Sequence, residues 1–156
     1  MQEFINILRQ QLILCKRVLE LGQAQQTDFT SMPAGENTGT ITHETENVLA
    51  QLAAVDKQQD AFFKRVGRAD AVGFLSGQPA SVERNMAQQL LQKLTGIMQQ
   101  IKKQNAVNRR LLDRHMQYIN FNVNVMTQVS SEPTYAPTQG ARQQASARMK
   151  MFDTSI

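Results

Sequence analysis

The chain has no tryptophan, a single cysteine and only two histidines among its 156 residues. Cys15 cannot form an internal disulfide, and it lies on the apolar face of a predicted helix, which favours a buried small side chain over a reactive thiol. His43 and His115 lack the neighbouring Cys or carboxylate ligands at helical spacing that a metal site needs. No glycine-rich phosphate loop or nucleophile motif occurs either. We therefore predict a protein that is not an enzyme and that uses no cofactor or metal.

Long hydrophobic runs are also missing. No apolar stretch approaches the ~18–20 residues that span a bilayer, and the first residues do not combine a basic region with an apolar block. We expect no membrane insertion and no export signal, hence a cytoplasmic protein in a reducing compartment. The net charge of +4 permits an acidic partner but lies within the range that solubility alone explains.

One stretch, from about residue 81 to 129, dominates the chain. It contains no proline, and at 1.5 Å per residue a helix of this length would extend roughly 70 Å. Its apolar residues recur every three or four positions, as on one face of a helix. These residues are Val82, Met86, Leu90, Leu94, Ile97, Ile101, Leu112, Ile119, Val123 and Met126.

Two shorter stretches, 2–26 and 41–66, show the same periodicity and predict two further helices. Thr40 or Thr42 is expected to cap the second, with Glu44 and Glu46 in its first turns. The connectors 27–40 and 67–80 are rich in Gly, Pro and polar residues, and the second could form a short helical turn. We predict an all-α fold: an elongated antiparallel three-helix bundle or coiled coil over residues 1–129, followed by a flexible tail over 130–156.

The third predicted helix is about twice as long as each of the others. If both pack beside the same half of it, its later half keeps an uncovered apolar stripe, which is a binding site or an oligomer interface. If they pack along different halves, most of the stripe is covered. Asn105 and Asn108 interrupt the stripe, where polar residues typically fix the register of a partner helix.

Basic residues lie beside this stripe and raise the alternative of nucleic-acid binding. We read them as a solvated face, because aromatic residues for base stacking are missing around them. No nucleic-acid partner is therefore expected. The residues are Lys93, Lys102, Lys103, Arg109, Arg110 and Arg114.

The order of the elements, together with two motifs, resembles the FlgN family of flagellar export chaperones. The first motif is Asn105-x-x-Asn108-x-x-Leu111-Leu112, and the second is Pro133-Thr134-Tyr135 followed by Gly140. The resemblance covers nearly the whole chain. It implies a cytoplasmic chaperone that holds the C-terminal helical segments of hook-filament junction proteins and delivers them to the membrane-embedded export gate.

This resemblance also suggests where the two partners bind. We expect Pro133, Tyr135 and Gly140 to dock on the export gate. Two other functions stay open, namely a structural coiled coil that self-associates, for example as a homodimer, and the basic nucleic-acid-binding module. The residues expected to contact the client are Asn105, Asn108, Leu111, Leu112, Met116, Ile119, Val123 and Met126.

Overall fold

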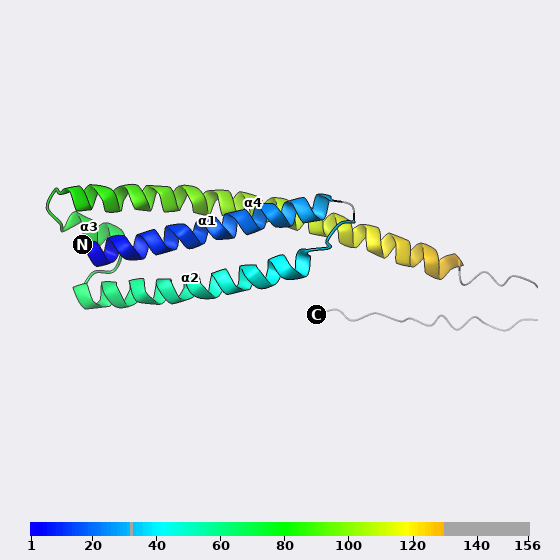
Figure 1. Cartoon of the computed structure of the whole chain (residues 1–156), viewed down its shortest axis with the longest axis horizontal. Coiled ribbons are helices and arrows are strands. Elements are labelled where there is room, and N and C mark those ends of the chain that lie inside the picture. The colour runs from blue at the N-terminus through cyan, green and yellow to red at the C-terminus, as the bar shows by residue number, and fades with distance from the viewer. Residues whose placement is uncertain (32, 130–156) are drawn as a thin grey trace, which may run out of the picture. The chain divides into compact units, whose positions relative to one another are not determined.

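The computed structural model describes residues 1–31 and 33–129, which form helices without any strand (Figure 1). The prediction of an all-α fold with one very long last helix is confirmed. Residues 1–119 form one compact unit, and the last turns of α4 belong to a second unit that begins at Asn120. The predicted tail over 130–156 lies outside the described residues. The helices are α1 (Gln2–Thr30), α2 (Thr38–Val66), α3 (Ala71–Ser76) and α4 (Val82–Val129).

Polar contacts show that α1 and α2 run antiparallel. Arg65 near the end of α2 pairs with Glu3 at the start of α1. At the other end of the pair, Arg17 of α1 contacts Glu44 of α2. Between these two pairs, Gln11 donates a hydrogen bond to Asp56.

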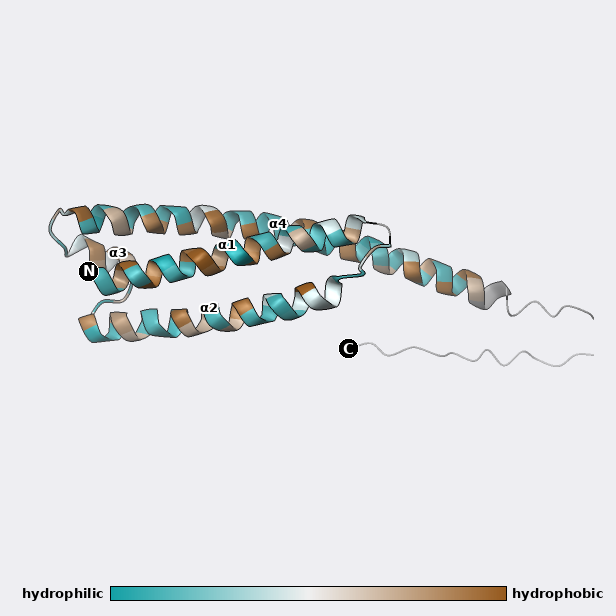
Figure 2. Ribbon diagram, viewed as in Figure 1, coloured by the Kyte–Doolittle hydropathy of each residue, from teal (hydrophilic) through white to brown (hydrophobic). Residues whose placement is uncertain are grey.

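α4 instead runs parallel to α1. Arg9 Nη2 donates to the sulfur of Met86 at 3.2 Å near the start of both helices. Further along, Asn108 Nδ2 donates to the carbonyl oxygen of Gly22 at 2.8 Å. α1 therefore lies beside α4 over most of its own length. In each of these long helices apolar and polar residues alternate with the helical period (Figure 2).

An aromatic cluster fills the end of the bundle where α1 begins. Phe4, Phe62, Phe63 and Phe74 lie with ring centroids 5.1–6.5 Å apart, several of them edge to face. Phe74 comes from α3, so the short helical turn expected between residues 67 and 80 is present and closes this end. Aromatic pairs in this geometry add to the free energy gained by burying the rings.

Two helix ends differ from the prediction. α1 continues to Thr30 rather than ending near residue 26, and α2 begins at Thr38 rather than 41. The predicted caps Thr40 and Thr42 are therefore wrong, because the N-cap position is Asn37. For the same reason the first turn of α2 contains no acidic residue, so Glu44 and Glu46 do not interact with the helix dipole as predicted.

The carboxylate that serves the start of α2 comes from α1. Asp28 is buried and accepts hydrogen bonds from the Asn37 backbone N–H at 2.9 Å and from the Thr38 hydroxyl at 2.6 Å. These bonds satisfy donors at the helix start that have no intrahelical partner. The connector is thus fixed by a contact between two helices.

In the described part of the chain, no helix is both long and apolar enough to cross a bilayer.

Candidate functional site

Three apolar side chains late in α4 form the candidate binding surface. Leu112, Met116 and Ile119 are 48%, 51% and 52% exposed, and we call these three residues the α4 surface. Their spacing of four and then three places them on one face of the helix. Earlier on α4, Ala87 and Leu94 are buried in the core. Apolar periodicity thus continues along the helix after burial ends.

The end of α1 explains this change in burial. Phe29, in the last turn of α1, is buried, and its ring lies 5.9 Å from the ring of His115. His115 Nε2 lies 2.7 Å from the carbonyl oxygen of Phe29, which accepts its hydrogen. α1 ends at Thr30, one residue after Phe29. His115 is thus a packing residue at the edge of the bundle.

The two asparagines of the predicted motif lie in different environments. Asn108 is buried, and its amide donates to the Gly22 carbonyl and to Gln25 Oε1. Gln104, one turn earlier, donates to Asn108 Oδ1 at 3.1 Å. Asn105 is exposed and makes no hydrogen bond within the described residues. Asn108 therefore fixes α4 against α1, whereas Asn105 remains available to a partner.

Gly22 makes this close contact possible. A Cβ atom at this position would lie 3.0 Å from Gln104 Cγ. Without a side chain, α1 exposes its backbone carbonyl to the amides of α4. Nothing in the sequence pattern indicated that the Gly22 carbonyl is the acceptor.

The remaining predicted client residues are distributed as follows. Leu111 is half-buried, which leaves less of its side chain for a partner. Val123 and Met126 belong to the second unit and are largely exposed there. Tyr118, which the periodic stripe did not include, is also exposed, at 66%. The only indication in the sequence was that Tyr118 is an aromatic residue outside the periodic apolar stripe.

Pro133, Tyr135 and Gly140, expected at the export gate, lie outside the described residues.

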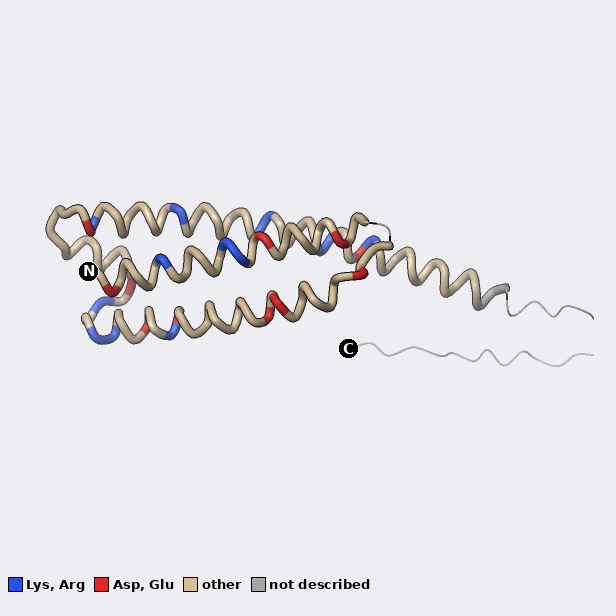
Figure 3. The backbone as a smooth tube through the Cα atoms, viewed as in Figure 1, with Lys and Arg blue, Asp and Glu red and all other residues tan. Residues whose placement is uncertain are grey.

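Charged residues of both signs occur on all three long helices. Figure 3 shows basic residues at intervals along α1 and α4 and a further group at the end of α2, where Lys64 and Arg65 lie in the last turn. The basic residues predicted to form a solvated face on α4 are exposed. Within residues 1–31 and 33–129, no three His, Cys, Asp or Glu side chains come together in a way that could hold a metal ion.

Comparison with known proteins identifies the family. The family model described as FlgN protein matches residues 1–143, which is most of the chain. No curated protein and no solved structure gives a significant match. A chaperone family agrees with the prediction that the chain is not an enzyme. The long last helix continues its apolar periodicity after burial ends, and the family model matches nearly the whole chain. The chain therefore belongs to the FlgN family of flagellar export chaperones.

Proposed function

We propose that this chain binds the C-terminal helical segments of hook-filament junction proteins in the cytoplasm, prevents their aggregation and delivers them to the export gate. The α4 surface is the observation that carries this proposal. It is an apolar face on a long helix that α1 leaves uncovered after Phe29. In soluble proteins, an exposed apolar face of this kind marks a site that a binding partner covers. An amphipathic client helix fits because its own apolar face needs the same protection.

The chemistry of the α4 surface suits more than one related client. Met116 at its centre is unbranched and adapts its shape to different partners. Complete burial of an exposed Leu, Ile or Met side chain contributes about 1.5–3 kcal/mol, so each of these half-exposed residues supplies about 1 kcal/mol. Losing two of them should therefore weaken client binding at least about tenfold, since 1.4 kcal/mol corresponds to a factor of ten.

Of the asparagines, we assign the client contact to Asn105. Its side chain is exposed and has free hydrogen-bonding capacity among the described residues, whereas the Asn108 amide is already used within the bundle. Leu111 is a minor contact because it is half-buried. Val123 and Met126 stay predicted contacts on the basis of sequence spacing.

The deciding experiment is co-purification with the C-terminal segment of a junction protein, followed by calorimetric titration. Replacing Met116 and Ile119 together by Asp puts two charges on the α4 surface and should abolish the complex. Both side chains are about half exposed, so the fold should survive, which circular dichroism checks. Ile13→Asp is the matched control, because Ile13 is 66% exposed on α1. An intact complex with the double variant would disprove this surface.

The export-gate contact is tested separately. We propose that Tyr135, presented by Pro133 and Gly140, docks on the gate protein. Prolines reduce the conformational entropy lost on binding, and tyrosine combines apolar area with a hydrogen-bonding hydroxyl. Tyr135→Ala should block motility while client binding persists. Normal motility of this variant would exclude the proposed gate contact.

A further inference from the structure

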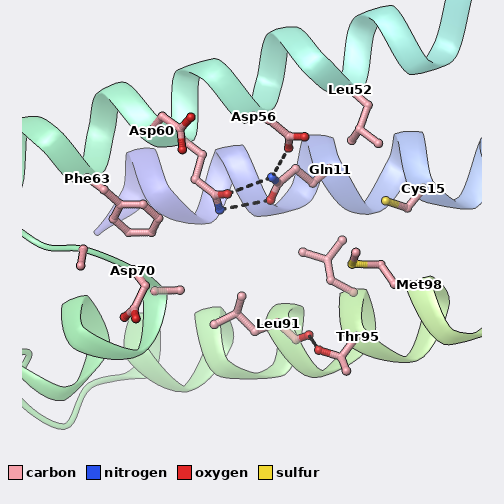
Figure 4. A pocket seen from close by; sticks show the side chains of 14 residues that line it. Gln11, Cys15, Leu52, Asp56, Asp60, Phe63, Asp70, Leu91, Thr95 and Met98 are labelled. Carbon is pink, nitrogen blue, oxygen red and sulfur yellow. Dashed lines mark hydrogen bonds between the residues drawn. The ribbon is translucent and has the colours of Figure 1, made fainter.

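A groove runs between α2 and α4, with α1 as its floor. It contains two cavities of about 600 and 350 Å³, and both are lined by Cys15 of α1, Leu52 of α2 and Met98 of α4. Figure 4 shows the larger one, with α1 lying behind the space between the two other helices. Because they share these three residues, the cavities are parts of one depression, which we call the α2–α4 groove.

The middle of the α2–α4 groove is apolar and partly open. Leu49 on α2 and Met98 on α4 are 46% and 62% exposed, although each lies on the side of its helix that lines the groove. Cys15 is buried on the floor, and burial, with a smaller contribution from Asp56, raises the pKa of its thiol. The thiol is thus held in its neutral form and adds to the apolar floor.

The two ends of the groove differ in charge. Asp56, Asp60 and Asp70 line the end near α3, and within the described residues no Lys or Arg lines that cavity (Figure 4). Asp56 accepts a hydrogen bond from Gln11 and Asp70 caps α3, while Asp60 is exposed without a hydrogen bond or ion pair in the described chain. Lys102 is the charged residue of the opposite end.

The length of the groove matches a helix of a few turns. On α4 the lining residues run from Leu91 to Asn105, and on α2 from Leu49 to Phe63. At 1.5 Å per residue, either span gives about 21 Å, or about four turns of helix. A helix lying there would complete a four-helix arrangement around the apolar side chains.

We infer that the α2–α4 groove binds one amphipathic helix of a partner protein, with basic residues beside Asp56, Asp60 and Asp70 and acidic residues beside Lys102. Helix-in-groove recognition takes its affinity from apolar anchors, which Leu49, Leu52 and Met98 would contact. The charges select the partner and its direction rather than adding much affinity. The α2–α4 groove contains none of the three residues of the α4 surface, although Asn105, assigned above to the client, lines its end near Lys102. The inference does not depend on the proposed function.

A labelled peptide tests the groove on the full chain. The probe is a synthetic helix of about 14 residues with leucines at helical spacing, two arginines at one end and two glutamates at the other. A second peptide replaces the arginines by glutamates. We expect the arginine peptide to bind with a dissociation constant at least tenfold lower, measured by fluorescence anisotropy.

Matched variants locate the binding site. Leu49→Gln with Met98→Gln should raise the dissociation constant at least tenfold. Ile13→Gln with Val82→Gln changes two exposed apolar residues outside the groove and should leave it unchanged. Asp60→Lys lowers the net charge of this end from three negative charges to one and should reduce the preference for the arginine peptide at least threefold, whereas Asp113→Lys, an equal charge change outside the groove, should leave it unchanged.

Three results would overturn the inference. The first is equal binding of both peptides, or none. The second is binding that Met116→Asp removes and the groove variants do not, which would place the peptide on the α4 surface and leave the proposed function standing. The third is a change from dimer to monomer with the groove variants in sedimentation, which would make a second copy of the chain the occupant.

Discussion

Asp28 joins the end of α1 to the start of α2 through its side chain. Hydrogen bonds from the Thr38 hydroxyl and then from the Asn37 backbone N–H hold the pKa of Asp28 below its ordinary value, although burial opposes this. A lowered pKa means that the folded state favours the charged carboxylate. The stabilisation is therefore complete above the unfolded pKa of about 3.9 and disappears as the pH falls through the lower folded value.

We predict that Asp28→Asn lowers the melting temperature at pH 7. The amide that replaces the carboxylate keeps one acceptor oxygen but loses the charge that strengthens these hydrogen bonds. The stabilisation begins to decline below the unfolded pKa of about 3.9 and is lost only when the folded carboxylate becomes protonated at its lower pKa, so the two melting temperatures should converge toward the acid end of the range. Thermal unfolding followed by circular dichroism from pH 7 to pH 2 measures this difference.

Thr38→Ala serves as the companion variant. It removes the hydroxyl donor but leaves the Asn37 N–H bond to Asp28 intact. The double variant should lose less stability than the sum of the two single variants, because both remove one shared interaction. Simple additivity, or a pH-independent effect of Asp28→Asn, would contradict the assigned role of this carboxylate.

We predict that replacing Asn108 lowers the free energy of unfolding of the protein more than replacing Asn105. Asn108→Ala removes buried hydrogen bonds to α1 and should reduce the free energy of unfolding by about 1–3 kcal/mol. Asn105→Ala changes an exposed side chain and should stay within about 0.5 kcal/mol of the wild type. Urea unfolding measures both values, and similar values for the two would contradict the assignment.

At the scale of elements, periodicity predicted the helices but not all their ends. The long α4 follows from apolar spacing without proline, and its observed start at Val82 lies one residue from the prediction. The start of α2 was missed because its stabilising carboxylate, Asp28, is nine residues upstream and on another helix. Similarly, spacing placed Asn105 and Asn108 on one stripe, but only the position of α1 determines which of them is buried.

Two glycines give opposite predictions for helix stability. Gly96 lies inside α4, and a Cβ there would meet nothing within 4 Å. Gly96→Ala should therefore stabilise the protein by about 0.5–1 kcal/mol, by reducing the conformational freedom of the unfolded chain. Gly67 ends α2 with φ of 64°, which disfavours any side chain, so Gly67→Ala should destabilise it by about 1 kcal/mol. Chemical unfolding of both variants compares the signs, and the same sign for both would contradict this reading.

At the scale of the first unit, α1 and α2 pack beside the same part of α4. α1 contacts α4 from Met86 to His115, and α2 faces it across the groove from Leu91 to Asn105. The sequence had left open whether the two shorter helices share one part of α4. The relative lengths of the predicted helices indicated that part of the apolar face of α4 would be left uncovered. Which part is uncovered depends on how the helices pair, and the sequence did not determine this. The α2–α4 groove was not predicted, because helix spacing cannot be read from periodicity.

Packing of this kind predicts unequal local stability along α4. Backbone amides beside buried Ala87 and Leu94 should exchange with solvent slowly, because opening them disrupts the core. Amides from Leu112 to Ile119, where all side chains except that of His115 are exposed, should exchange at least about tenfold faster. A short helix without packing is only marginally stable in water. Hydrogen exchange read by mass spectrometry measures both segments, and uniform protection would contradict the assigned end of packing.

Hydrogen exchange also distinguishes binding at the α4 surface from binding in the α2–α4 groove. A junction-protein segment should slow exchange between residues 112 and 119, where its helix covers the α4 surface. The arginine peptide should slow exchange in the stretches that line the α2–α4 groove, 49–63 and 91–105. Each ligand is the control for the other, since both are amphipathic helices of similar apolar character. Protection of the same segment by both would mean that one surface serves both ligands, and protection of neither would remove both surfaces.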